Sequence, residues 1–307
     1  MSSNASTRVI IAALIGNTAI SITKFFAAFA TGSSAMLSEG IHSLVDTGNQ
    51  ILLLYGMKQA KKPADEAFPF GHGKEIYFWS FVVAILIFAV GSGVSIYEGI
   101  HHVLHPVEIE NPMVNYIVLG LALVFEGSAW FFAFKEFGKV KGQRGYIEAV
   151  KRGKDPSMFV VLFEDSAAIS GLMIAMLGVW LTQVTGIAVF DGIASIVIGL
   201  ILGVTAIWLA VETKGLLIGE GANRSVIASI RQIAESFDEV ENVNELLTMH
   251  MGPEFILVNI SIRFKRGQMT REIEAVIQEI DSAIKAKHEM VKRIFVEAEP
   301  AGELKRA

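Results

Sequence analysis

Three ionisable side chains recur at helical spacing in residues 38–50, which read SEGIHSLVDTGNQ. Glu39, His42 and Asp46 follow one another at intervals of three and four residues, which places them on one stripe of a helix. Apolar runs border the stretch on both sides. In water such a stripe is an ordinary polar face. In a bilayer, three ionisable groups on one face are costly and indicate a function.

A later apolar run carries a second acidic pair, Glu164 and Asp165, at a comparable depth. His42 and Asp46, one helical turn apart, can hold one ion between them. An imidazole and two or three carboxylates suit a divalent first-row metal. We therefore predict a metal site in this region. A hydrogen-bonded contact between helices is the alternative, but it would not need so many costly ionisable groups.

The composition indicates which elements must position these side chains. The chain has 307 residues, of which 52% are hydrophobic and only 19% charged, whereas a soluble domain averages about 25% charged residues. A membrane-crossing helix needs roughly 20 apolar residues. Six runs are long enough, and they lie near residues 8–31, 35–58, 75–103, 112–134, 157–183 and 188–212. We predict six transmembrane helices over residues 1–212.

Lysine and arginine predict the orientation of these helices. They gather in the connections 58–74 and 135–154 and are absent from the other three connections. Basic loops stay on the cytoplasmic side, so both termini are expected there. The amino-terminal segment is too short and too weakly charged for a cleaved signal or transit peptide. We expect a multi-pass integral membrane protein of a bacterial inner (plasma) membrane, embedded in the lipid bilayer.

The composition also argues against cysteine chemistry and against a nucleic-acid partner. The chain has no cysteine, which excludes disulfides, thiolate metal sites and thiol catalysis. Basic residues cluster only where the topology explains them, so no nucleic-acid partner is expected.

From residue 213 to 307 the pattern becomes that of a soluble α+β domain. Residues 255–264 alternate between apolar and polar positions, as a half-buried strand does. Thr270 can cap a helix with a regular isoleucine and valine stripe. The predicted order is helix, strand, strand, helix and strand, over residues 223–237, 243–250, 255–264, 270 onward and 293–297. A domain of this size favours pairing with a second copy.

Other ionisable residues interrupt the apolar runs. Lys24 either extends its ammonium group to the interface or pairs with a buried carboxylate. Glu126 is a candidate for a proton relay or for that pairing. Glu98 and Asp191 lie near outer helix ends, where we expect them to be solvated. Three histidines on the same side are interpreted as interfacial residues in preference to metal ligands: His101, His102 and His105.

Three motifs resemble those of one known family. GSSAMLSEGIHSLVDTGNQ (residues 32–50) closely resembles the second-helix motif of the cation diffusion facilitator (cation efflux) family. FPFGHGKEIYFWSF (68–81) looks like its loop into the third helix, and LLIGEGAN (216–223) looks like its entry to the cytosolic domain. The resemblance covers nearly the whole chain, including the six spans and the carboxy-terminal domain.

The resemblance implies a secondary transporter that exports divalent transition metals, often zinc, from the cytosol in exchange for protons. It also implies a homodimer with a ferredoxin-like cytosolic domain, and no cofactor beside the transported metal. His42 and Asp46 match the second-helix half of the transport site, and Asp165 matches the aspartate of the fifth-helix half.

The fifth helix departs from the family pattern. Val161 stands where the family commonly has a histidine or aspartate, and Glu164 lies directly beside Asp165. LFEDSAAISGLMIA (162–175) resembles the branch of mitochondrial-type zinc transporters. The predicted metal ligands are His42, Asp46, Asp165 and Glu164. Such a set has more hard oxygen ligands than a site with two histidines. Mn, Fe(II) and Co are therefore possible substrates beside zinc.

The cytosolic regions offer weaker candidates for a second metal site. His72, beside Asp65 and Glu66, marks a candidate site in the loop between the second and third helices. Several family members bind zinc through histidines on the cytosolic sheet, but this chain carries other residues at the matching positions. We therefore predict no high-affinity zinc cluster there, because those positions hold Asn244, Asn259, Glu297 and Glu299.

The ligand chemistry predicts coupling to protons. Metal binding needs neutral His42 and ionised carboxylates, so metal and protons compete for one site. Alternating access in a helix bundle then exchanges one for the other. Two alternatives are a passive divalent-cation channel and an intramembrane metallohydrolase. The chain lacks the His-Glu-x-x-His arrangement of the latter, and no enzymatic activity is expected.

Overall fold

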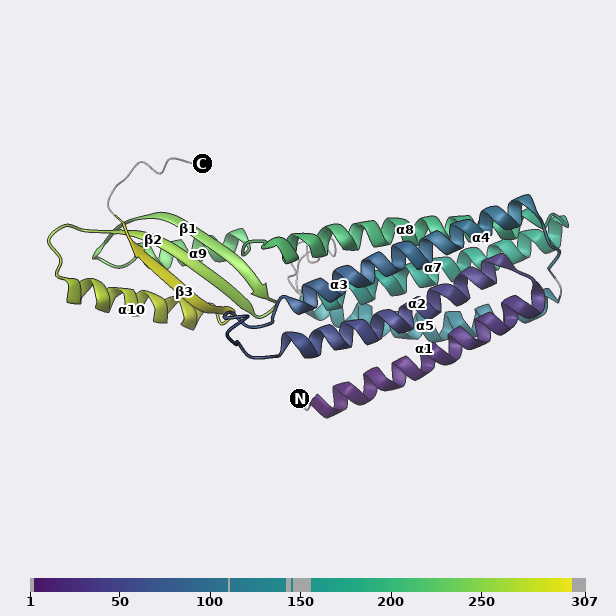
Figure 1. Cartoon of the computed structure of the whole chain (residues 1–307), viewed down its shortest axis with the longest axis horizontal. Coiled ribbons are helices and arrows are strands. Elements are labelled where there is room, and N and C mark those ends of the chain that lie inside the picture. Colours follow the sequence, from purple (N-terminus) through teal and green to yellow (C-terminus); the bar gives the residue numbers. More distant parts are fainter. Residues whose placement is uncertain (1–2, 110, 142–144, 146–155, 300–307) are drawn as a thin grey trace. The chain divides into compact units, whose positions relative to one another are not determined.

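A computed structural model describes residues 3–109, 111–141, 145 and 156–299 of the chain (Figure 1). The described residues form two compact units. The first includes residues 3–58, 76–141 and 156–214, and it consists of long helices. The second includes residues 59–75 and 215–299, and it holds the β-sheet. The placement of a domain boundary after residue 212 stays a prediction.

Each predicted apolar run of the first unit lies in a helix. The elements are α1 (Ser3–Thr31), α2 (Ser34–Ala60), α3 (Glu75–Leu86), the π-helix η1 (Ile87–Ser92), α4 (Gly93–Leu104), α5 (Pro112–Lys141), α7 (Pro156–Thr185) and α8 (Val189–Ile218). The sixth run was expected to end near residue 212, but α8 continues to Ile218. In the third run, one π-helical segment separates α3 from α4.

Four helical segments among the described residues are long and apolar enough to cross a membrane. They are Glu75–Leu104, Pro112–Lys135, Val160–Thr185 and Val189–Ile218. The other two long helices, α1 and α2, have 29 and 27 residues. The prediction of six spans therefore stays a prediction for α1 and α2.

Helix α2 turns its polar side chains inward. Its buried residues include Ser34, Ser38, Glu39, His42 and Asn49, while Leu44 and Ile51 are exposed. A helix in lipid buries ionisable groups against its neighbours because exposing them to hydrocarbon is costly. The polar face of α2 is therefore an interior face of the helical unit.

Two tight turns lie at one end of the helical unit. Gly32 and Ser33 alone join α1 to α2, and residues 186–188 join α7 to α8. Gly32 and Gly186 have φ angles of 70° and 71°, a left-handed conformation that favours glycine. Each glycine also donates its N–H to a carbonyl of the preceding helix, as a helix C-cap does. Each turn thus closes a short hairpin of two helices.

Helices α4 and α8 pack with their backbones close together. A Cβ atom added at Gly99 of α4 would meet the Gly192 carbonyl and Ile196, and one added at Gly192 would meet the Gly99 carbonyl. Gly199 lies equally close to Ile96. Small residues at such positions permit the close helix packing that stabilises membrane proteins.

The second unit confirms the predicted order of elements. It comprises α9 (Arg224–Glu235), β1 (Val240–Gly252), β2 (Phe255–Phe264), α10 (Thr270–Lys287) and β3 (Val291–Ala298). The sheet order is β1-β2-β3, with β1 antiparallel and β3 parallel to β2. The ferredoxin-like assignment stays a prediction.

The apolar positions of β2 form the core of this unit, as the alternation predicted. Val258, Ile260 and Ile262 are fully buried, and they cluster with Ile230 of α9 and Ile280 of α10. One expectation was wrong in detail, because Thr270 is the first residue of α10 and does not cap it. Met269 occupies the cap position, and its N–H donates to Glu272 at 2.9 Å.

Candidate metal site in the helical unit

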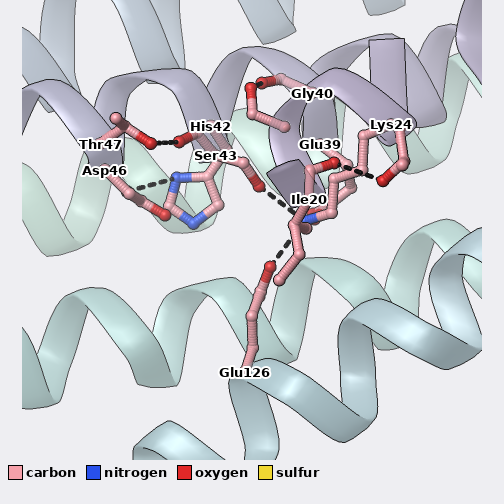
Figure 2. A network of polar contacts seen from close by, with 11 residues as sticks. Ile20, Lys24, Glu39, Gly40, His42, Ser43, Asp46, Thr47 and Glu126 are labelled. Carbon is pink, nitrogen blue, oxygen red and sulfur yellow. Dashed lines mark hydrogen bonds and ion pairs between the residues drawn. The ribbon is translucent and has the colours of Figure 1, made fainter. Parts of the chain in front are cut away.

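Helix α2 holds His42 and Asp46 side by side on its buried face (Figure 2). His42 Nδ1 lies 3.2 Å from Asp46 Oδ1, as the spacing of four residues predicts. Among the described residues, neither ring nitrogen of His42 has a hydrogen-bond partner. The imidazole therefore retains a lone pair for a ligand.

Helix α7 brings Glu164 to this face of α2. Glu164 is buried, and its Oε1 accepts a hydrogen bond of 2.6 Å from the Asn49 amide. The carboxyl groups of Glu164 and Asp46 lie within hydrogen-bonding reach of each other. The structure thus places one candidate ligand of α7 against one of α2, 118 positions earlier in the chain.

Asn49 is a residue of this region that the sequence reasoning missed. It lies three residues after Asp46 and seven after His42, so helical spacing puts it on their stripe. That spacing was the available signal. The amide is a weak signal of function, because burying an uncharged side chain in a membrane costs much less free energy than burying a carboxylate.

Asp165 sits less centrally than Glu164. It is half-buried, and the carboxylates of Glu164 and Glu126 are its electrostatic neighbours. Successive helical residues point about 100° apart, so Asp165 and Glu164 do not face one point equally. No three His, Asp or Glu side chains of the described residues are gathered closely enough to hold one metal ion. The four-ligand site stays a prediction.

Lys24 of α1 forms a separate cluster next to His42 (Figure 2). Its Nζ lies 3.1 Å from Glu39 Oε2, 2.8 Å from Ser43 Oγ and 2.8 Å from Glu126 Oε1. An ammonium group has three donors, and all three find acceptors here. Lys24 and Glu39 are wholly buried. The pairing alternative is confirmed, and the interfacial placement of Lys24 is excluded.

The two clusters differ in charge. Lys24 neutralises one of its two carboxylate neighbours. By contrast, the salt bridges of the described residues include none from a lysine or arginine to Asp46, Glu164 or Asp165. The negative charge of this second group is therefore left for a proton or a metal ion to balance.

At the opposite end of α2, one expectation was wrong. Asp191 was expected to be solvated at the interface, but it is fully buried and accepts hydrogen bonds from the first turn of α2. His102, also expected at the interface, is 6% exposed. His101 and His105 are exposed, with ring centroids 4.9 Å apart. The turns at this end therefore create a buried polar junction that apolar run lengths do not reveal.

In the second unit, the loop histidine pairs with one acid. His72 Nε2 lies 2.9 Å from Asp65 Oδ2, and the Phe68 N–H donates to Asp65 Oδ1 at 2.7 Å. The hydrogen bond from His72, followed by that from Phe68, lowers the pKa of Asp65. Glu66 is exposed. A second metal site in this loop stays a prediction.

The four positions considered for zinc lie on or next to the sheet of the second unit, in two separate groups of contacts. Asn259 donates to Glu297 at 3.1 Å, Ser261 donates to Glu299 at 2.6 Å, and Asn244 lies 3.4 Å from Ser261. The carboxylates of Glu297 and Glu299 thus each accept a hydrogen bond from an amide or hydroxyl group of the protein. The expectation that this unit holds no high-affinity zinc cluster stays a prediction.

Comparison with known proteins identifies the family. A model of the cation efflux transmembrane domain matches residues 10–218, and a model of the cation efflux protein cytoplasmic domain matches residues 222–301. The chain belongs to the cation efflux family and is a multi-pass membrane protein. The family consists of transporters, so the metallohydrolase alternative is excluded.

Three relatives illustrate the range of the family. The Xenopus laevis proton-coupled zinc antiporter SLC30A9, mitochondrial, is 32% identical over 281 residues, which cover 89% of this chain and 50% of the relative. The Arabidopsis thaliana metal tolerance protein C4 is 30% identical over 86% of this chain and 58% of its own length. The Bacillus subtilis manganese efflux system protein MneP is 22% identical over 96% of both chains. The chain spans about half the length of the first relative.

Proposed function

We propose that the protein exports a divalent transition-metal cation from the cytosol in exchange for protons. His42, Asp46, Glu164 and Asp165 are the proposed ligands. The observation that carries this proposal is the approach of the half-buried Asp46 and the buried Glu164 carboxyl groups. No lysine or arginine among the described residues forms a salt bridge with either of them.

Two carboxyl groups at this separation need a positive charge between them. Two like charges in one buried site repel strongly, and one of the groups then holds a proton. A divalent cation supplies the same balance with ionised ligands, and its binding releases the proton. Proton and metal therefore exclude each other at Asp46 and Glu164. Neutral His42, whose ring nitrogens face no protein donor, completes the metal-bound state.

Exclusive occupancy becomes exchange when the site opens to one side of the membrane at a time. We propose that α1 and α2 complete a bundle of six spans, with the basic loops on the cytoplasmic side. The proposed membrane is a bacterial inner membrane. We further propose a homodimer that pairs through the carboxy-terminal domain, from residue 213 onward, because the matching family model is of a cytoplasmic dimerisation domain.

Zinc is the proposed main substrate. Two features support it: His42 is a nitrogen donor that suits zinc, and the Xenopus relative is named as a zinc antiporter. The carboxylate-rich set also accepts harder ions, and the Bacillus relative is named for manganese efflux. A comparison of Zn, Mn, Fe(II) and Co as substrates therefore belongs in the first experiment.

The test is metal flux in vesicles containing the purified full-length protein. With an acidic lumen, protons leave and metal should accumulate inside beyond its external concentration. With an alkaline lumen, accumulation should stop. Equal flux under both gradients would overturn the exchange and favour the passive channel. Glu98→Gln is a matched control, because it removes a half-buried carboxylate of α4 that lies outside the proposed ligand set.

A further inference from the structure

Asp191 joins the first turn of α8 to the first turn of α2. Its Oδ1 accepts a hydrogen bond of 2.6 Å from the Ser33 hydroxyl. Its Oδ2 accepts from the Ser34 N–H at 2.5 Å, the Ser34 hydroxyl at 3.0 Å and the Ala35 N–H at 3.2 Å. The side chain has no exposed surface. One buried carboxylate thus accepts four hydrogen bonds from residues 33–35, at the start of α2.

These hydrogen bonds satisfy backbone N–H groups in the first turn of α2. The first N–H groups of a helix have no partner within it, and a negative charge is favourable at that end. Ser33 provides the usual cap, since its hydroxyl oxygen accepts the Met36 N–H at 3.1 Å. Asp191 then accepts hydrogen bonds from the Ser33 hydroxyl and from the N–H groups of Ser34 and Ala35. Helix α2 therefore begins where α8 places it.

A second polar contact lies one turn further along both helices. Ser38 Oγ is 2.5 Å from Ser195 Oγ, and the Ser195 hydroxyl also lies 2.8 Å from the Ser95 carbonyl of α4. The pairs Ser34–Asp191 and Ser38–Ser195 are both separated by 157 positions in the chain. Two contacts with the same offset mean that α2 and α8 run parallel here in one fixed register.

The same row of α2 continues to the candidate ligands. Ser34, Ser38, His42 and Asp46 follow at intervals of four residues, so they lie along one side of the helix. Helix α8 is joined through residues 186–188 to α7, which carries Glu164. A shift of α2 along α8 would therefore move His42 and Asp46 relative to Glu164.

We propose that Asp191 is a positioning residue for metal exchange. It fixes the axial register of α2 against α8 and thereby sets where His42 and Asp46 stand relative to Glu164. This inference rests on the proposed function, because it assigns Asp191 a role in that same transport site. Asp191 itself does not touch the metal.

The test uses the full-length protein and the variant Asp191→Asn, which keeps the size of the side chain but removes its charge. The apparent affinity for Zn²⁺ should fall by about tenfold or more, as for other residues that orient metal ligands. Glu98→Gln should leave the affinity unchanged.

A distance measurement distinguishes a change in the register of α2 from a general loss of protein stability. The chain has no cysteine, so the exposed residues Leu44 of α2 and Met173 of α7 can be replaced by cysteine as the only spin-label sites. In Asp191→Asn, the label distance distribution should shift or broaden. If Asp191→Asn fails to fold, Ser38→Ala loosens only the second contact and should change the distance and the Zn²⁺ affinity in the same direction, by less.

An unchanged distance distribution together with an unchanged Zn²⁺ affinity would overturn the inference, even if the melting temperature falls. For Ser38→Ala the same pair of results counts equally against it. Failure of the wild-type protein to transport metal against its gradient would instead overturn the proposed function. The distance measurement does not depend on transport, so the two failures are distinguishable.

Discussion

Two acidic clusters lie next to each other along the inward face of α2 and differ in one respect. Glu39 shares Lys24 with Glu126, whereas Asp46 meets Glu164 with no lysine or arginine pairing among the described residues. A lysine is covalently fixed, so one of the two carboxylate charges beside Lys24 is balanced permanently. The cluster without a lysine must take its positive charge from exchangeable ions. We propose that this difference separates a structural ion cluster from the metal site.

The comparison also explains how a membrane protein can keep so many carboxylates. A buried charge is costly unless it is paired and hydrogen-bonded. Lys24 satisfies this requirement with three acceptors, one from a hydroxyl and two from carboxylates. Asp46 and Glu164 satisfy it only when a proton or a metal is present. The following experiments test this contrast.

The largest effect is expected from removing one charge of the transport site. Asp46→Asn and Asp165→Asn should each abolish proton-driven metal transport, because an amide offers a weaker ligand and cannot exchange a proton. Flux into vesicles with an acidic lumen measures the loss. Both variants should remain in the membrane fraction. Transport close to the wild-type rate in either variant would remove that residue from the site.

Lys24→Met should destabilise the protein strongly, because it leaves the buried Glu39 and the half-buried Glu126 without their cation. Breaking a buried ion pair by removing one partner costs about 3–5 kcal/mol. The double variant Lys24→Met with Glu126→Gln should recover part of that loss, since one of the two orphaned charges is gone. Thermal unfolding in detergent measures both. A double variant as unstable as Lys24→Met alone would contradict the role of Lys24 as counter-charge to Glu126.

Glu164→Gln tests whether Glu164 belongs to the proposed ligand set. If Glu164 is a metal ligand, this variant should lose transport as completely as Asp165→Asn. Val161→His should then partly restore transport and shift the preference toward zinc. Asn49→Ala, which removes the amide that holds Glu164, should reduce transport less than Glu164→Gln. Normal transport with unchanged pH dependence in Glu164→Gln would leave His42, Asp46 and Asp165 as the protein ligands.

The smallest effect is expected in the loop of the second unit. The folded-state pKa of Asp65 is lowered by His72 and the Phe68 N–H, so its stabilising contribution is complete above the unfolded value of about 3.9. That contribution is lost as the pH falls through the folded value. In His72→Ala the pKa of Asp65 should rise, and the loop should loosen at a higher pH. Titration of the Asp65 carboxyl group followed by NMR checks this. An unchanged pKa of Asp65 would show that His72 does not lower it.

Much of the architecture could be predicted from local patterns. Apolar run lengths located the long helices, and two-residue alternation located β2 and its buried face. Intervals of three and four residues put Glu39, His42 and Asp46 on one stripe. These features depend on neighbouring residues of one element, and the periods of helices and strands are fixed by backbone geometry. The sequence by itself therefore determined which residues α2 turns inward.

The tertiary structure decided which partners those residues meet. Lys24 could snorkel or pair, and only the packing of α1 against α2 and α5 brings Glu126, 102 positions away, to its ammonium group. Asp191 was expected in solvent because it lies near a helix end, yet the turn before α8 delivers it to the first N–H groups of α2. Contacts of this kind depend on the rotation and axial register of one helix against another. No local period carries that information, since it arises only when the helices pack.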